Sequence, residues 1–161
     1  MSLDDYLEKY AAKGILIDTN VLVLLVVGLY REERIKTFKR TEQYTPGDFR
    51  LILRFVDRFQ RRITTPNILT ETDNIVRQLA QREHEHVARV LAILAAEFCE
   101  QYQPSRDITQ TLWFARLGLA DCVTIAIAQD VLVITDDWEL SGILSNLDRD
   151  AININHVREL N

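Results

Sequence analysis

Residues 131–137, Val-Leu-Val-Ile-Thr-Asp-Asp, contain the clearest strand pattern of the chain, followed by two aspartates. Residues 131–134 are apolar at every position and rich in β-branched side chains, which predicts a strand covered on both faces, as in a parallel sheet. Residues 15–17, Ile-Leu-Ile, have the same character and are followed by Asp18-Thr19-Asn20. We therefore expect two central strands that each end beside an aspartate.

Helical patterns alternate with short strands along the remainder of the chain. Further strands are expected at 63–65 and 151–155, and Thr70 is expected to cap a helix after the first of these. This alternation predicts an α/β fold, with a central parallel β-sheet between two layers of helices, in a single domain over 1–161. The expected helices cover 21–30, 49–61, 71–79, 83–102, 109–117, 120–129 and 138–147.

Composition narrows the class of protein. The chain has 161 residues, and its net charge of −5 argues against a protein that coats nucleic acid by bulk charge. Cys99 and Cys122 lie in apolar helical patterns, and we expect both to be reduced core residues. No secretory signal is visible, and the apolar run 21–29 is too short to span a bilayer. We therefore expect a soluble cytoplasmic protein with no segment that spans a membrane.

Acidic side chains follow several predicted strands. Asp18 comes after the first strand, Glu71 after the second, and Asp136-Asp137 after the strand at 131–134. Asp121 is a fourth candidate, in the first turn of a helix. Because ligands of open α/β sheets bind at the carboxyl ends of the strands, these acids are expected to meet in one cleft.

Clustered carboxylates repel one another, and a hard divalent cation would offset that repulsion. Mg²⁺ prefers oxygen ligands and keeps several waters, and Mn²⁺ accepts similar ligands. His84, His86 and His156 do not have zinc-site spacing. Taken singly, each acid has a structural explanation as a helix cap, a first-turn acid or a turn residue. The joint pattern is more specific than any one of its members.

These stretches resemble the PIN-domain family of metal-dependent ribonucleases, which includes the VapC-type toxins. The resemblance spans almost the whole chain and implies a three-layer α/β/α fold and hydrolysis of RNA with Mg²⁺ or Mn²⁺. It matches Asp18, Glu71, Asp121 and Asp137 to the acidic quartet, with Asp136 as a neighbouring or auxiliary ligand. It also matches Asn20 and Thr135 to supporting polar residues. The matching stretches are Ile15–Leu22, Ile63–Glu71, Leu119–Ala128 and Val131–Asp137.

The basic residues of the chain are concentrated in one part of it. Residues 31–62 contain ten Lys and Arg against five Asp and Glu, a charge of +5, which leaves −10 for the rest of the chain. Arg50, Arg54 and Arg58 share one predicted helix and are candidate RNA contacts. A solvated helix face with ion pairs explains the same pattern, and both interpretations stay open.

Two other functions share part of this sequence pattern. A haloacid-dehalogenase-like phosphatase needs a second Asp two residues after the first, where this chain has Asn20. A non-catalytic PIN-like module that binds RNA or protein is the main alternative. The resemblance also implies two kinds of partner besides RNA, a small antitoxin protein or a second copy in a homodimer, and the sequence does not choose between them.

Overall fold

The computed structural model describes residues 2–159, and its centre is a five-stranded parallel sheet in the order β3-β2-β1-β4-β5. The strands β1, β4 and β2 confirm three of the predicted positions to within one residue. All residues of β1 and β4 are buried, as expected for central strands. The strands are β1 (Ile15–Ile17), β2 (Arg62–Thr64), β3 (Cys99–Glu100), β4 (Leu132–Thr135) and β5 (Ala151–Asn153).

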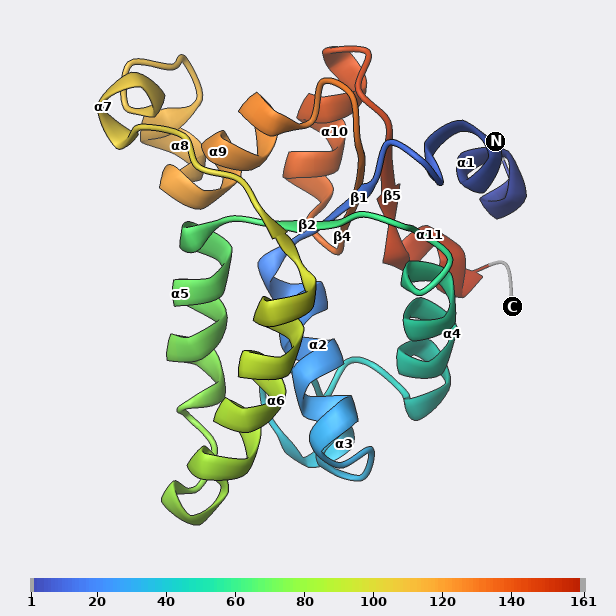
Figure 1. Cartoon of the computed structure of the whole chain (residues 1–161), viewed down its shortest axis with the longest axis vertical. Helices are drawn as coiled ribbons and strands as arrows, with labels where there is room; N and C mark the ends of the chain where they lie inside the picture. The colour runs from blue at the N-terminus through green and yellow to red at the C-terminus, as the bar shows by residue number, and fades with distance from the viewer. Residues whose placement is uncertain (1, 160–161) are drawn as a thin grey trace.

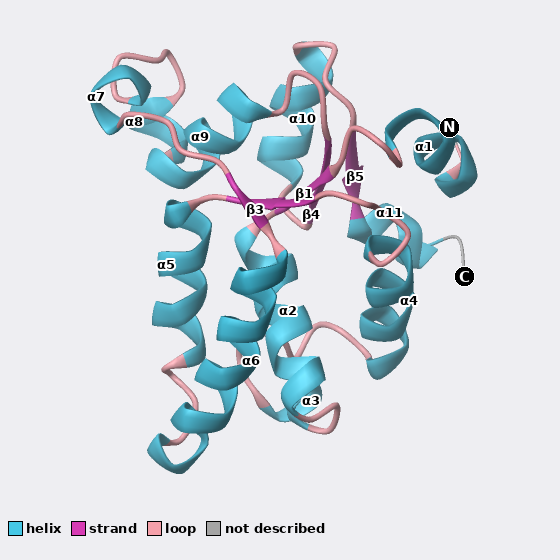
Figure 2. Cartoon of the chain, viewed as in Figure 1, coloured by secondary structure: helices cyan, strands magenta, loops and turns pink. Residues whose placement is uncertain are grey.

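Helices cover both faces of the sheet, so the predicted three-layer α/β/α fold is confirmed (Figures 1 and 2). Figure 1 shows α9 and α10 above the sheet and α2, α4, α5 and α6 below it. The longer helices are α1 (Leu3–Tyr10), α2 (Thr19–Tyr30), α4 (Pro46–Val56), α5 (Pro66–Val76), α6 (His84–Glu97), α9 (Leu119–Ile127) and α10 (Trp138–Asn146). The short ones are α3 (Arg34–Thr37), η1 (Gln81–Glu83), α7 (Ser105–Ile108), α8 (Phe114–Leu117) and α11 (Ile154–Glu159).

Helix α2 is the centre of the lower layer. Residues 21–28 are all buried, because α2 packs against α3, α4, α5 and α6 as well as β4. This explains why its sequence shows no polar face. Among residues 2–159, no helix combines the length and apolar character that crossing a membrane requires.

Several predicted helix boundaries were wrong, for identifiable reasons. Helix α5 begins at Pro66, because the Thr65 hydroxyl accepts the Ile68 amide and proline suits a first helical position; Thr70 is not its cap. Helix α4 likewise begins at Pro46 behind a Thr45–Asp48 capping box, and it ends at Val56.

Two longer helices were also over-predicted. The helix expected over 83–102 ends at Glu97, and β3 follows and pairs with β2. Cys99 is therefore exposed on an edge strand, contrary to expectation, whereas Cys122 is buried as predicted. Of the helix expected over 109–117, only the short α8 forms, and the last strand stops at Asn153.

Candidate active site

The sheet order places a ligand site beside β1. From β1 the chain moves to β2 and β3 on one side, and β4 and β5 then fill the other side, so the order reverses between β1 and β4. Such a reversal opens a crevice at the carboxyl ends of the two strands. Asp18 follows β1 there, and Asp137 lies two residues beyond the last residue of β4.

Asp18 is held by two hydrogen bonds. Its Oδ1 accepts the Thr19 amide at 2.7 Å, and its Oδ2 accepts the hydroxyl of Thr135 at 2.6 Å. The Thr135 Oγ1 in turn accepts the backbone amide of Asp137 at 3.0 Å. Thr135 therefore bridges the loops after β1 and β4.

Glu71 and Asp121 come from helices on opposite faces of the sheet, and α5 contacts α9. The Glu71 Oε2 accepts the Thr19 hydroxyl at 2.9 Å, which ties α5 to the start of α2. Asp121 stands in the first turn of α9, which begins after Gly118 at a φ of 83°, a conformation that favours glycine. The Asp121 carboxylate accepts no hydrogen bond from any residue between 2 and 159.

All four acids of the predicted quartet line one open cleft of about 410 Å³. The structure thus brings together the side chains that the sequence placed at separate strand and helix ends. The other lining residues are Thr19, Asn20, Arg40, Asn74, Ile75 and Gln78.

The acids oppose one another electrostatically. Burial raises the pKa of Asp121 to about 7, and the charges of Asp18, Asp137 and Glu71 add to this. Burial also raises the pKa of Asp18 to about 6, although the Thr135 and Thr19 hydrogen bonds act to lower it. None of the four carboxylates pairs within 4.0 Å with a basic side chain of the described residues.

Asp137 and Asp136 have different surroundings. Asp137 caps α10, with its Oδ1 accepting the amides of Glu139 at 2.6 Å and Leu140 at 3.0 Å, while its side chain still lines the cleft. Asp136 instead accepts the Tyr44 hydroxyl and, at 2.9 Å, the amide group of Asn20, and it is not among the lining residues.

Asn20 was expected to support Asp18, but its hydrogen bond goes to Asp136. Asn20 and Tyr44 thus hold Asp136 from two sides, and the negative charge of Asp136 contributes to the raised pKa of Asp18.

The cleft has further residues that the sequence did not single out. Arg40 is a cation among the acids, and Thr19 orients Glu71. Tyr44 is completely buried, although its segment has no regular pattern. The only sequence signal for Arg40 was the overall excess of basic residues in 31–62.

The neighbourhood of the site contains two further features. Trp138 follows Asp137, has 54% of its surface exposed, and meets His156 edge to face at 4.5 Å between ring centroids. Glu139, which also raises the pKa of Asp121, is paired with Arg116.

None of the candidate RNA contacts lines the cleft. Arg50 and Arg54 lie on α4, whereas Arg58 follows the end of α4 at Val56, so the prediction that all three share one helix was wrong. Arg50 pairs with Glu32 at 2.5 Å, whereas Arg54 and Arg58 are exposed and form no ion pair within the described residues.

The donor chemistry of the cleft fits a hydrated divalent cation. The oxygen atoms that the lining residues offer come from carboxylate, hydroxyl and amide groups, which suits Mg²⁺ or Mn²⁺. Within residues 2–159, however, no three His, Cys, Asp or Glu side chains are arranged to hold a metal ion. The fit is therefore to an ion held directly by one or two carboxylates and otherwise by water, which is the usual coordination of Mg²⁺.

Comparisons of this chain with protein-family models, with curated proteins and with solved structures gave no match. Its function is accordingly inferred from its own residues and geometry.

Proposed function

We propose that this protein is a metal-dependent endoribonuclease of the PIN type, which hydrolyses RNA phosphodiester bonds with Mg²⁺ or Mn²⁺. One observation carries the proposal: four carboxylates from four separate segments line a single cleft at the reversal of strand order, without a paired cation. A cluster of this kind raises the free energy of the folded protein unless positive charge enters it. A divalent cation bound by these carboxylates would offset their repulsion and would also attract the phosphodiester of an RNA substrate.

Each residue has a separate task in this proposal. Asp18, fixed by Thr135 and the Thr19 amide, is the best-oriented ligand, and Asp121 or Asp137 would complete the direct contacts. A bound divalent cation supplies charge relief at the phosphate and lowers the pKa of water. Glu71, held by the Thr19 hydroxyl, faces the same cleft and would accept a proton from the attacking water or orient a second ion. Arg40 would contact a phosphate oxygen of the substrate.

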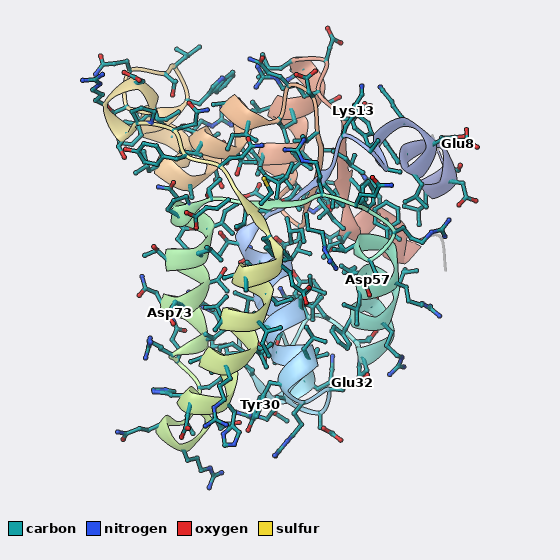
Figure 3. The ribbon with its side chains drawn as sticks, viewed as in Figure 1. Glu8, Lys13, Tyr30, Glu32, Asp57 and Asp73 are labelled. Carbon is teal, nitrogen blue, oxygen red and sulfur yellow. The ribbon has the colours of Figure 1, made fainter. Side chains whose placement is uncertain are left out.

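Substitution of Asp18 tests the proposal. Asp18→Asn should lower cleavage by about 10²-fold or more while preserving the fold, because the amide keeps the shape but loses the charge. The assay uses structured and unstructured RNAs with Mg²⁺, with Mn²⁺ and with EDTA. Asp73→Asn is the matched control, because Asp73 lies on α5 with Glu71 but pairs with Arg77 at 2.8 Å outside the cleft (Figure 3). Equal activity of the Asp18 variant and the wild type would refute the assignment.

A PIN-like module that binds RNA or protein without cleaving it is the second candidate. The observation in its favour is that no three acidic side chains of the described residues are placed to hold an ion. A Mn²⁺ titration separates the two functions, because a saturable thermal shift that disappears in Asp18→Asn and Asp137→Asn supports the enzyme. An antitoxin and a second copy of the chain remain the predicted protein partners.

A further inference from the structure

A second pocket, of about 390 Å³, lies at the far end of α2. Because α2 has 12 residues and begins directly after Asp18, this pocket lies about 18 Å from Asp18 along the helix. It is lined by Tyr30, Arg31, Arg34, Ala80, Arg82, Glu83 and His86. Three arginines against one glutamate give it a positive charge, opposite to that of the cleft.

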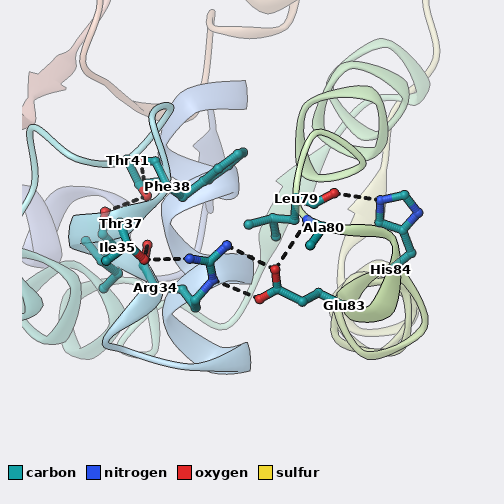
Figure 4. Close-up of polar contacts among 9 residues, drawn as sticks. All are labelled: Arg34, Ile35, Thr37, Phe38, Thr41, Leu79, Ala80, Glu83 and His84. Carbon is teal, nitrogen blue, oxygen red and sulfur yellow. Dashed lines mark hydrogen bonds and ion pairs between the residues drawn. The ribbon is translucent and has the colours of Figure 1, made fainter.

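One arginine of the pocket is already committed. Arg34 binds Glu83 through two hydrogen bonds, of 2.8 and 3.0 Å, and so neutralises a buried carboxylate (Figure 4). This pair joins α3 to η1, and both of its residues line the pocket. It does not account for the other two arginines.

Arg31 and Arg82 remain available to a ligand. Both are exposed, and neither lies within 4.0 Å of a carboxylate of the described residues. Arg31 follows the last residue of α2 and packs over the Tyr30 ring at 5.3 Å, while His86 meets the same ring at 5.9 Å. The α2 helix dipole would favour Arg31 at this position, but it does not explain Arg82, which comes from η1.

The two pockets are connected by shared segments. The segment 34–40 contributes Arg34 to the basic pocket and Arg40 to the acidic cleft. Gln78 lines the cleft and Ala80, two residues later, lines the basic pocket. A chain of phosphates that enters the cleft at Arg40 could therefore continue along this side of α2.

We propose that Arg31 and Arg82 form a second phosphate-binding site, which holds the backbone of a single-stranded RNA away from the bond being cut. The inference rests on the proposed nuclease function and extends it. Arginine suits phosphate because its guanidinium donates paired hydrogen bonds. RNA fits better than an acidic protein because Arg40 and the acidic cleft lie at the other end of the same path.

Binding without cleavage provides the first test. Arg31→Glu/Arg82→Glu is compared with the wild type by anisotropy of a labelled single-stranded RNA of about 12 nucleotides in EDTA, over a salt series. The affinity should fall at least tenfold in the variant. Truncation to Arg31→Gln/Arg82→Gln should lower the salt slope of log affinity by about 1.4, since each single-strand phosphate contact contributes about 0.7. Circular dichroism confirms that both variants are folded.

Lys13→Glu/Arg106→Glu is the control with the same change of charge. Both of its residues are exposed, and Lys13 lies at the opposite end of the molecule from Tyr30 (Figure 3). Affinities of the Arg31/Arg82 variant that equal those of this control would overturn the proposal. So would a wild-type protein that binds poly-glutamate but not RNA, because the occupant would then be an acidic protein.

Substrate length separates this proposal from the nuclease function. A dinucleotide is too short to reach the second site, so the wild type and the Arg31→Glu/Arg82→Glu variant should cleave it equally. The same variant should cleave the longer RNA more slowly than the wild type does. A wild type that cleaves neither substrate would refute the nuclease function. The loss of RNA affinity in the variant would still support the second site.

Discussion

At Asp121, burial and the neighbouring acidic side chains oppose ionisation of the carboxyl group. Its pKa is about 7 in the folded protein against an ordinary value of 3.8, so the folded protein keeps a proton that the unfolded chain has lost. The protonated Asp121 therefore favours the folded state. This contribution to the free energy of unfolding is fully present below about pH 4 and is lost as the pH rises through about 7. Without metal, the free energy of unfolding should therefore decrease over this range.

Asp121→Asn should remove most of that decrease. At pH 8 and without metal the variant should be more stable than the wild type by on the order of 2 kcal/mol, because no charge is then buried among the other acids. Urea unfolding at pH 5 and pH 8 measures the difference, with the exposed Asp130→Asn as control. Some pH dependence should persist through Asp18, whose pKa is also raised. Parallel profiles for the variant and the wild type would contradict this account of the site.

At the scale of elements, α2 approaches α4 through a glycine. A Cβ atom added at Gly28 would overlap the Phe49 ring, and Phe49 is buried in the first turn of α4. The close packing of these helices therefore depends on the absence of a side chain at position 28.

Gly28→Ala should destabilise the protein by about 1–3 kcal/mol through overpacking, measured by denaturant unfolding. Gly142→Ala in α10 is the matched control, because apart from its chain neighbours and the backbone of its own helix no atom of residues 2–159 lies within 4 Å of the added Cβ. It should stabilise the protein by about 0.5–1 kcal/mol. The added substitution Phe49→Leu should recover part of the loss. An unchanged free energy of unfolding in Gly28→Ala would show that α2 and α4 can move apart without losing stability.

The positions of strands could be predicted where burial on both faces makes the sequence apolar at every position. The strands β1 and β4 were predictable because central parallel strands are apolar throughout, and the acids after them were predictable because parallel strands end at one edge. β3 was missed because Phe98 continues the apolar spacing of α6, and only pairing with β2 ends that helix. Tyr44 and Arg40 belong to an irregular segment whose course depends on tertiary contacts, so no period in the sequence locates their side chains.

At the scale of the whole molecule, charge is distributed unevenly. The net charge of −5 conceals the +5 of residues 31–62. Part of this excess is neutralised by acids outside the segment, as in the pairs Arg34–Glu83 and Arg62–Glu97, whereas Arg54 on α4 and Arg58 just after it are exposed. Long-range attraction of a polyanion would therefore depend on a few unpaired groups.

Reversing Arg54 and Arg58 together should weaken RNA binding and flatten its salt dependence, because two cations that attract the backbone become anions. Binding is followed in EDTA, and the Lys13→Glu/Arg106→Glu protein again provides the charge-matched reference. Cleavage of a dinucleotide should be unaffected, since neither arginine lines the cleft. Unchanged affinity would show that Arg54 and Arg58 are merely solvated and do not contact RNA.

The position of Trp138 gives the molecule a built-in optical probe. Its indole follows Asp137, is half open to water and rests against His156. Emission from such a ring responds to local polarity and to paramagnetic quenchers, so occupancy of the neighbouring crevice can be followed in real time on unlabelled material. Replacing Trp113 by Phe would leave Trp138 as the only indole in the sequence and assign the signal to it.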